Sequence, residues 1–389
     1  MQSDVSLIDH YVDNRFNPEF QETLEALLHE SPFFLFTKTR IIENFRKFET
    51  LFPGSSIHYA MKANSEPEIL QTLSDAGCSF EVASIYELNM LKELKVPAER
   101  IIFGTSIKPA SHIKQFFDYG VDRFAFDSHS ELEKIASAAP GARVYVRAIA
   151  YDAGSVYKFS EKFGADLFNV VSLLLRAKEL GLRPYGISFN VGSQASNPRA
   201  WASTLKDLAP IIKELQDAGV IIDVLNLGGG FPCAYTSATH VPLLEVIADH
   251  TLKEYKKLPY QPKLILEPGR GLIADTGTLV TSVIARVERK GATWLFLDAG
   301  CYNALFETMA YQGSTRYAIT SMRQVGEAGE SLFAVAGPTG DSHDVITREV
   351  LLPQDIAVGD RLIVRNVGAY SLVNASSFNG FPKPDVYFV

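Results

Sequence analysis

Residues 56–84 read SIHYAMKANSEPEILQTLSDAGCSFEVAS, and this stretch decides the fold. The short apolar runs Ser56–Lys62 and Cys78–Ser84 indicate strands, and apolar residues at helical spacing in Glu66–Gly77 indicate a helix between them. A strand, a helix and a strand in this order are typical of a βαβ unit with parallel strands.

The same alternation extends from about residue 33 to about residue 270. Six more strands are predicted, most of them separated by helical segments such as Arg199–Gly219: Ile101–Thr105, Asp122–Ser128, Arg143–Ala150, Pro184–Gly192, Val224–Gly228 and Lys263–Glu267. Eight strands that alternate with helices predict an α/β fold, a (β/α)8 TIM-like barrel over residues 33–275.

The sequence beyond Arg270 has short strands and turns with few helical periods. The predicted strands there are Gly271–Arg289, Thr293–Asp298, Leu332–Ala336, Arg361–Asn366 and Asp385–Val389. They predict a C-terminal, mostly β domain over residues 276–389, and we expect residues 1–32 to pack on it.

The composition excludes several classes of protein. The 389 residues include 37 Lys and Arg against 45 Asp and Glu, and this net charge of −8 argues against a nucleic-acid partner. No run approaches the ~18–20 apolar residues of a membrane span, and the first residues lack the basic region of a signal peptide, so we expect a cytoplasmic protein with no membrane partner. The three cysteines form no CxxC pair and the eight histidines form no spaced ligand set, so no metal is expected.

Side chains at the C-terminal ends of barrel strands face one shared pocket, so these ends form the candidate site. The first predicted strand ends at Lys62, and a lysine in a partly desolvated pocket can lose its proton and become a Schiff-base nucleophile. A lysine that packs its stem and keeps its charge in solvent is commoner, so Lys62 needs support from other residues.

Three other strand ends supply such residues. The seventh strand runs into Gly228-Gly229-Gly230, whose N–H groups can surround an anion, although one or two glycines would suffice for a tight turn. The sixth strand leads to Ser193, whose hydroxyl can also bind phosphate. The eighth ends at Glu267 and Arg270, a carboxylate and a guanidinium at the same rim.

A lysine, a phosphate cradle and an acid at one face are what pyridoxal phosphate requires. Lys62 would form an imine with the cofactor, the glycines and Ser193 would hold its phosphate, and Glu267 would keep its ring nitrogen protonated. A sugar-phosphate enzyme could share the cradle, but it would not need the lysine and the acid at these strand ends.

Further motifs occur in order along the chain. They are YAMKAN (59–64), FEVAS (80–84) followed by Glu87, Arg147, KFG (162–164), LGGGFP (227–232), EPGR (267–270), VGAY (367–370) and FNGF (378–381). From about Pro32 to Phe381 the chain resembles the fold-type III pyridoxal-phosphate-dependent decarboxylases, in particular their short bacterial ornithine/lysine decarboxylase-like branch.

The resemblance implies a cofactor site and a reaction. The residues that it places against pyridoxal 5'-phosphate are Lys62, Glu81, Arg147, Asn190, Ser193, Gly228, Gly229, Gly230, Glu267, Gly269, Arg270 and Tyr370. Because the related alanine racemases have an arginine at the ring nitrogen, an acid at Glu267 favours decarboxylation over racemisation. Lys62 and Glu267 would then be catalytic, and the electrons left by carbon dioxide would be held in a quinonoid.

The resemblance also implies a substrate and a partner. The segment Tyr302–Met309 would place Glu307 beside a distal amine, and the loop Gly337–Asp344 would bring Asp341 to that amine from a neighbouring subunit. Two carboxylates around an ammonium would select a basic L-amino acid such as ornithine or lysine. With Tyr302 and Phe378 as further substrate contacts, the expectation is a homodimer with shared active sites that acts in polyamine biosynthesis.

Two positions depart from the family pattern. Asn190 stands where the family has a histidine stacked on the cofactor, and Gly340 stands where the family has a cysteine that helps to protonate the substrate carbon. Asparagine offers less flat surface than imidazole, and glycine supplies no proton.

These departures leave three hypotheses. The protein could form an amine, with Lys62, His343 or water as the proton donor, or it could divert the quinonoid to a carbonyl product by transamination or by reaction with dioxygen. It could instead be a non-catalytic homologue that binds a regulatory protein, as the antizyme inhibitors do. The third is disfavoured because a binding-only protein has no use for Lys62, Glu267 and Tyr370 together. Loss of the α-carboxylate is common to the first two, which leave the product open.

Overall fold

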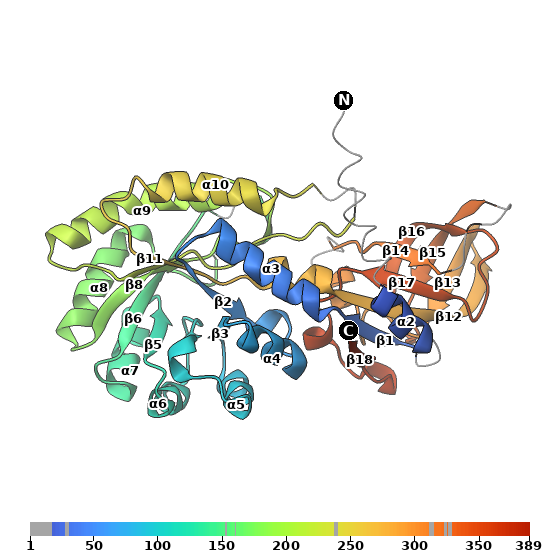
Figure 1. The fold of residues 1–389 in the computed structure, drawn as a ribbon, viewed down its shortest axis with the longest axis horizontal. Coiled ribbons are helices and arrows are strands. Elements are labelled where there is room, and N and C mark those ends of the chain that lie inside the picture. The colour runs from blue at the N-terminus through green and yellow to red at the C-terminus, as the bar shows by residue number, and fades with distance from the viewer. Residues whose placement is uncertain are drawn as a thin grey trace. The chain divides into compact units, whose positions relative to one another are not determined.

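The computed structural model describes residues 18–27, 31–151, 154–159, 161–236, 240–310, 315–322, 325 and 329–389. The chain divides into two compact units (Figure 1). The barrel unit comprises residues 42–232 and 241–272, and the β unit comprises the described residues within 1–41, 233–240 and 273–389. We describe each unit by itself.

The barrel unit contains a closed barrel of eight parallel strands, in the order β10-β11-β2-β3-β4-β5-β6-β8. The strands are β2 (Ser56–Ala60), β3 (Ser79–Val82), β4 (Ile101–Phe103), β5 (Arg123–Phe126), β6 (Arg143–Ala148), β8 (Arg183–Phe189), β10 (Val224–Asn226) and β11 (Lys263–Leu266). The predicted barrel is therefore confirmed, and each predicted strand overlaps an observed one. The observed strands end slightly earlier, because their last predicted residues leave the ladder and enter the loops at the C-terminal mouth.

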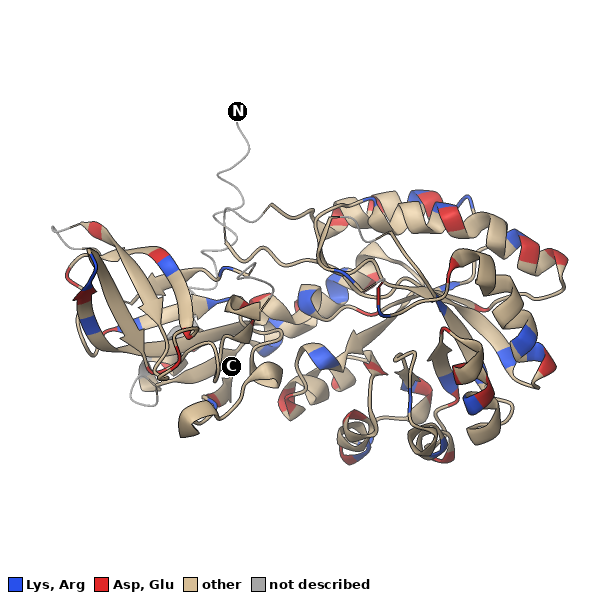
Figure 2. Ribbon diagram, turned by 180° about the vertical axis from the view of Figure 1, so that it is seen from behind, with Lys and Arg blue, Asp and Glu red and all other residues tan. Residues whose placement is uncertain are grey.

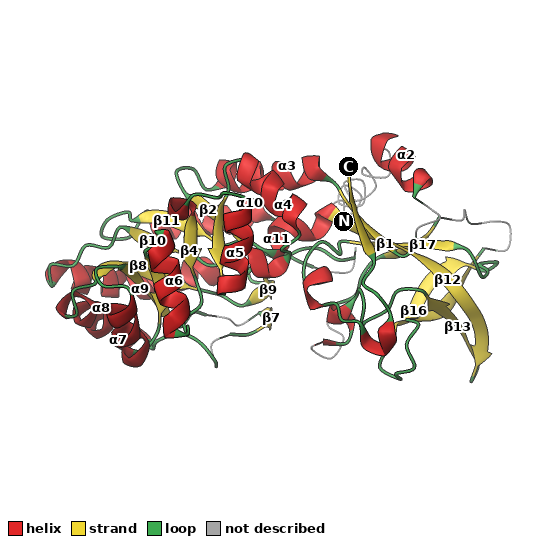
Figure 3. Cartoon of the chain, turned by 90° about the horizontal axis from the view of Figure 1, so that it is seen from below, coloured by secondary structure: helices red, strands yellow, loops and turns green. Residues whose placement is uncertain are grey.

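Helices surround these strands (Figure 3). They are the main part of α3 (Lys38–Leu51), α4 (Pro67–Asp75), α5 (Ile85–Glu93), α6 (Ala110–Tyr119), α7 (His129–Ala138), α8 (Val170–Glu179), α9 (Ala200–Asp217) and α10 (Leu244–Tyr255). Two of the helices begin with a serine cap: Ser84 Oγ accepts the Glu87 N–H, and Ser128 Oγ accepts the Glu131 N–H. Both sequences have a glutamate three residues after the serine, the signature of a helix start.

A small antiparallel pair, β7 (Ser155–Tyr157) and β9 (Ser193–Ala195), also belongs to the barrel unit. It positions Ser193 beyond the end of β8, after the turn at residues 190–192. Blue and red segments alternate along the outer helices of this unit (Figure 2). Many are pairs one helical turn apart, such as Lys114 with Asp118 and Lys213 with Asp217, which stabilise helices modestly.

The β unit is built on a mainly antiparallel sheet with the order β14-β17-β12-β13-β15-β16. These strands are β12 (Gly277–Arg289), β13 (Ala292–Leu297), β14 (Ile319–Ser321), β15 (Glu330–Ala336), β16 (Val345–Pro353) and β17 (Arg361–Arg365). On another path, β1 (Phe33–Phe36) pairs with β12 and with β18 (Asp385–Phe388). Short helices interrupt the unit, among them η7 (Phe306–Thr308), η9 (Leu372–Asn374) and η10 (Phe378–Gly380).

Strand β1 belongs to the β unit by its hydrogen bonds, whereas the predicted domain boundary at residue 33 assigns it to the barrel. All four of its residues are buried, because both neighbouring strands and the core cover it. The helix α2 (Pro18–Ala26) packs Phe20 and Leu24 against Phe33 and Leu35. The rest of the predicted N-terminal segment, residues 1–17 and 28–30, lies outside the described residues.

The strand predicted from Gly271 begins only at Gly277, because the preceding residues form α11 (Arg270–Ile273) and the short η6 (Ala274–Thr276). Gly277 lies against the Gly368 backbone, where a side chain would have no room. Among the helices that the structure describes, none combines the length and the apolar character needed to cross a membrane.

Candidate active site

Lys62 and Glu81 form an ion pair at the C-terminal ends of β2 and β3. Lys62 lies in η3 (Met61–Ala63), directly after β2, and Glu81 lies opposite Ala60 in the parallel ladder. Lys62 Nζ lies 3.0 Å from Glu81 Oε2, and the side chains are 46% and 3% exposed. A buried carboxylate therefore holds an amine that solvent and small molecules can still reach.

Glu267 follows β11 and is held at both its backbone and its side chain. Its N–H donates to Gly228 O at 2.8 Å, and Asn226 Nδ2 donates to its Oε1 at 2.6 Å. Desolvation raises the pKa of Glu267 to about 7, and the negative charge of Glu81 adds to this effect. A carboxyl group of this kind can keep or share a proton near neutral pH.

Arg147 brings a positive charge to the same mouth from β6. It interacts electrostatically with Glu267, Glu81 and Asp127, and its guanidinium lies 5.0 Å from the Phe163 ring centroid. Burial lowers the pKa of Arg147, and the neighbouring acids oppose that effect. Arginine stays protonated. The ends of β2, β3, β6 and β11 therefore contribute two cations, Lys62 and Arg147, and two acids, Glu81 and Glu267, to one charge network, with Asp127 as a third acid near Arg147.

The glycines after β10 approach neighbouring backbone closely. Gly228 and Gly230 have positive φ values of 65° and 96°, and a Cβ added at Gly229 would lie 2.7 Å from Glu267 O. Phe231, next in sequence, stacks on Trp201 with ring centroids 4.8 Å apart. Backbone packing alone thus accounts for the glycines. The Gly228 N–H donates to Asn226 Oδ1 at 2.9 Å, so of the three predicted phosphate donors it is the one already used within the protein, and the Gly229 and Gly230 N–H groups are the candidates for a ligand.

Ser193 and Arg270 supply buried donors from the neighbouring loops. Arg270 Nε donates to Ser193 Oγ at 3.3 Å, and its guanidinium lies 5.2 Å from the Tyr157 ring centroid. Gly269 directly precedes Arg270 and accepts the Leu272 N–H through its carbonyl at 3.0 Å, which fixes the start of α11. A buried hydroxyl and guanidinium are suited to an anion such as phosphate.

Asn190, where the family pattern has histidine, has a local structural role. Its Oδ1 accepts the Gly192 N–H at 3.0 Å, a turn typical of asparagine. This turn leads directly into Ser193. The side chain is therefore engaged in shaping the loop.

Five of the remaining predicted residues are grouped by the β unit. His343 donates its backbone N–H to Asp341 Oδ1 at 2.7 Å, and its Nδ1 lies 2.9 Å from the same oxygen. Tyr302 also bonds to the Asp341 side chain, and the two hydrogen-bonding neighbours hold the Asp341 pKa below its usual range. The Tyr302 and Phe378 rings stack with centroids 4.5 Å apart, and Gly340 N–H donates to Asn379 next to Phe378.

Two further predicted residues lie in the β unit. Glu307 is buried in η7, 4% exposed, and Tyr370 takes a positive φ of 58° at the end of the VGAY motif. Asn374 Nδ2 donates to Tyr370 O at 3.0 Å, which holds this backbone. The predicted site residues are thus distributed over both units, with the cofactor set of Lys62 to Arg270 at the barrel mouth and the substrate set in the β unit.

Sequence reasoning missed two residues that shape the site. Asn226 bonds to Glu267 from within β10, and the only sequence signal was a polar residue inside an apolar run. Gly104 follows β4, and a Cβ added there would overlap the Glu81 carboxylate. Both contacts join segments distant in sequence, so local pattern does not reveal them.

The donor set fits pyridoxal phosphate. It has an accessible lysine amine, an acid with a pKa near neutrality for a ring nitrogen, and buried serine and arginine donors for a phosphate. Comparison with known proteins also indicates pyridoxal phosphate as the cofactor. The family model described as "Pyridoxal-dependent decarboxylase, pyridoxal binding domain" matches residues 38–274.

Three relatives extend the similarity over nearly the whole chain. The lysine/ornithine decarboxylase of Selenomonas ruminantium is 33% identical over 351 residues, 90% of this chain and 88% of that protein. The crystal structure of the Vibrio vulnificus lysine/ornithine decarboxylase with putrescine has a TM-score of 0.86 and 30% identity, covering 96% of this chain and 99% of that one. The Paramecium bursaria Chlorella virus arginine decarboxylase with agmatine has a TM-score of 0.88 and 28% identity, covering 96% and 100%. The chain therefore belongs to the fold-type III pyridoxal-phosphate-dependent decarboxylases.

Proposed function

We propose that this protein releases the α-carboxylate of a basic L-amino acid, such as ornithine or lysine, as carbon dioxide. The observation that carries the proposal is the charge network at the barrel mouth, where Lys62 lies 3.0 Å from the buried Glu81 and the pKa of Glu267 rises to about 7. A relative crystallised with the diamine putrescine supports a basic substrate.

Bound pyridoxal phosphate supplies an aldehyde that condenses with amines and a ring that accepts the electron pair left by carbon dioxide. Lys62 would hold the aldehyde carbon, and Glu81 would orient the Lys62 amine. Glu267 would share its proton with the ring nitrogen and so keep that nitrogen protonated. Ser193, Arg270 and the N–H groups of Gly229 and Gly230 would bind the phosphate, with Tyr370 as a further contact, while the Gly228 N–H holds Asn226.

Glu307 and Asp341 would bind the distal ammonium of the substrate. A buried carboxylate such as Glu307 favours a cation over a neutral side chain, because a charge-assisted hydrogen bond is stronger than a neutral one. Asp341 would come from the second subunit of a homodimer, beside the stacked rings of Tyr302 and Phe378. A diamine product would place the protein in polyamine biosynthesis.

His343 is our candidate for returning a proton to the substrate carbon, because Gly340 offers none. Asp341 Oδ1 lies 2.9 Å from His343 Nδ1, which favours a proton on that nitrogen and leaves Nε2 to exchange one. The His343 side chain is 79% exposed, so it can reorient.

A second outcome is a carbonyl product, by transamination or by reaction with dioxygen. Two observations favour it: Gly340 has no proton to give, and Asn190 uses its carbonyl oxygen for the Gly192 turn. Slow protonation of the substrate carbon would leave time for either side reaction.

Mass spectrometry of aerobic incubations with L-ornithine, L-lysine and L-arginine, with oxygen uptake followed in parallel, tests both outcomes. We expect a product lighter by carbon dioxide alone and no oxygen consumption. A carbonyl product would establish the second outcome, by dioxygen if oxygen is consumed and by transamination if it is not.

The Lys62→Ala protein is the control. It should lose both the visible absorbance of the lysine-bound cofactor and turnover. Full turnover in Lys62→Ala would exclude the proposed mechanism, and no turnover by the wild-type protein with any basic amino acid would exclude the substrate class.

A further inference from the structure

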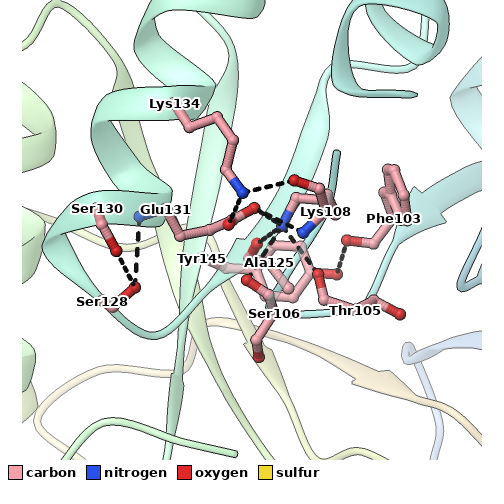
Figure 4. Close-up of polar contacts among 10 residues, drawn as sticks. All are labelled: Phe103, Thr105, Ser106, Lys108, Ala125, Ser128, Ser130, Glu131, Lys134 and Tyr145. Carbon is pink, nitrogen blue, oxygen red and sulfur yellow. Dashed lines mark hydrogen bonds and ion pairs between the residues drawn. The ribbon is translucent and has the colours of Figure 1, made fainter. Parts of the chain in front are cut away.

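A second cluster of charges lies within the barrel unit, apart from the residues assigned above. Lys108 lies in the loop between β4 and α6 with no exposed side-chain surface, and Glu131, in the first turn of α7, is 3% exposed. Lys108 Nζ lies 2.9 Å from Glu131 Oε1, and Lys134 Nζ lies 2.6 Å from Glu131 Oε2 (Figure 4). Burial lowers the pKa of Lys108 to about 8 even though Glu131 raises it. A buried ion pair often adds little net stability. The Lys108–Glu131 pair is therefore a candidate for a role other than stabilising the fold.

Lys108 is held at its backbone and its side chain together. Its N–H donates to Glu131 Oε1 at 3.1 Å, and its carbonyl accepts from Lys134 Nζ. Its ammonium donates to Thr105 O at 2.8 Å and to Ala125 O in β5. Figure 4 shows Glu131 and Lys134 reaching from α7 toward this loop. The cluster therefore ties residues 104–109 to the end of β5 and to the start of α7.

The first residue of that loop lies against Glu81, the ion-pair partner of Lys62. Gly104 N–H donates to Val82 O at 3.1 Å, next to Glu81 in β3. A Cβ on Gly104 would overlap the Glu81 carboxylate, so the Gly104 backbone packs directly against that carboxylate. The opposite oxygen of Glu81 is the one that lies 3.0 Å from Lys62 Nζ.

We propose that the buried cluster of Lys108, Glu131 and Lys134 is a positioning device that holds Gly104 against Glu81 and thereby sets the position of the carboxylate that faces Lys62. Lys108 and Glu131 are positioning residues, because they act through the loop and contact no residue of the proposed cofactor set. This inference rests on the proposed role of Lys62. If the loop moves away, Glu81 can shift toward the vacated space, and the charge beside the Lys62 amine weakens.

The test replaces the pair by apolar residues of similar size, in Lys108→Met/Glu131→Leu, because removing one partner would leave a buried charge. The matched control is Arg143→Met/Asp122→Leu, which removes a 2.6 Å ion pair at the opposite, N-terminal end of β5 and β6. A third variant, Gly104→Ala, displaces the Glu81 carboxylate directly.

The readouts separate positioning from stability. The first is the pH midpoint of the visible absorbance of the cofactor bound to Lys62, which senses the negative charge beside the amine. The second is the dissociation constant for pyridoxal phosphate. The third, made on the cofactor-free protein, is hydrogen exchange at the Gly104 N–H. Thermal unfolding of all variants identifies any loss that is only structural.

We expect Lys108→Met/Glu131→Leu and Gly104→Ala to shift the midpoint in the same direction, by about half a pH unit or more, because both weaken the charge beside the amine. Cofactor affinity and kcat should fall about 10-fold, because displacing catalytic groups by a fraction of an ångström is costly. Exchange at Gly104 should become faster in the cluster variant. The control should show none of these changes.

An unchanged midpoint, affinity and exchange rate in Lys108→Met/Glu131→Leu, beside a shift in Gly104→Ala, would overturn the proposal and leave the cluster a stabilising one. If the double variant does not fold, Lys134→Met replaces it in the same three measurements. The Lys134 side chain is 31% exposed, so its removal should be better tolerated. A wild-type protein with no visible band on adding pyridoxal phosphate would instead remove the role of Lys62.

Discussion

The carboxyl group of Glu267 has a pKa of about 7 in the barrel mouth, against 4.5 in a model compound, first through burial and then through the charge of Glu81. Between these two values the folded protein binds this proton more tightly than the unfolded chain, so stability falls as the pH rises through the window. We expect Glu267→Gln to increase the free energy of unfolding of the cofactor-free protein at pH 8 by up to ~3 kcal/mol, and by little at pH 4. Urea unfolding at the two pH values measures this.

The same substitution should reduce decarboxylation, because a neutral amide cannot hold the ring nitrogen protonated. The expected pairing is thus higher stability without cofactor and lower turnover with it. Equal stability of Glu267→Gln and wild type at pH 8 would show that Asn226 and Lys62 already compensate the buried charge.

Gly340 can accept a side chain, which allows a direct test of the missing proton donor. Its φ is ordinary, and among the residues that the structure describes an added Cβ would meet only Asn379 Oδ1 within 4 Å, at 3.9 Å. We expect Gly340→Cys to change thermal stability by less than ~0.5 kcal/mol and, if the wild-type protein releases any carbonyl product, to raise the amine fraction, because a thiol can protonate the substrate carbon. Product analysis by mass spectrometry measures the ratio. Gly340→Ala, which adds the carbon without the thiol, should leave the ratio unchanged.

Individual residues differ in how far the sequence predicts them. Lys62 and Glu267 were predicted to be site residues because each ends a predicted strand, and the barrel brings such ends together, whereas Glu81 was predicted from the family resemblance. Asn226 and Gly104 were not, because their importance comes from contacts with Glu267 and Glu81 across the barrel. Local spacing carries no information on which loops touch.

The loop after β10 and the segment after β11 hold each other in place. Glu267 N–H donates to Gly228 O at 2.8 Å, and a Cβ at Gly229 would lie 2.7 Å from Glu267 O. We expect Gly229→Ala to push these segments apart and to weaken pyridoxal phosphate binding about 10-fold or more, because phosphate donors and the acid at the ring nitrogen both shift. A fluorescence titration with the cofactor measures the affinity. Wild-type affinity in Gly229→Ala would mean that the loop moves without changing the site.

At the level of elements, the barrel strands were predictable because they are short runs rich in β-branched and aromatic residues, most of them followed by a helical segment. Strand β1 is a short apolar run as well. Its sequence does not indicate that it pairs with β12 and β18 and not with a barrel strand. Strand β16 was missed because its exposed and half-buried residues outnumber its buried ones. Both β1 and β16 are defined by their hydrogen-bonded partner strands, which the local sequence pattern does not reveal.

At the scale of the whole molecule, the residues of the proposed site are divided between the two units. Lys62 and Glu267 belong to the barrel unit, and Asp341 belongs to the β unit. If the active site takes Asp341 from the second subunit of a homodimer, two inactive variants should complement each other. Mixing Lys62→Ala with Asp341→Ala under conditions that exchange subunits makes half of the dimers hybrid. Each hybrid has one site with both residues intact, so about 25% of wild-type activity should return.

The control mixes Lys62→Ala with Glu267→Ala, two lesions in the same barrel unit. A hybrid of these two has no intact site, because each barrel lacks one of its own residues, so no activity should return. Activity in the first mixture but not in the second would place Asp341 across the interface. Equal inactivity of both mixtures, with subunit exchange verified by mass spectrometry, would mean that each chain builds its site from its own Asp341 and that the shared-site dimer is wrong.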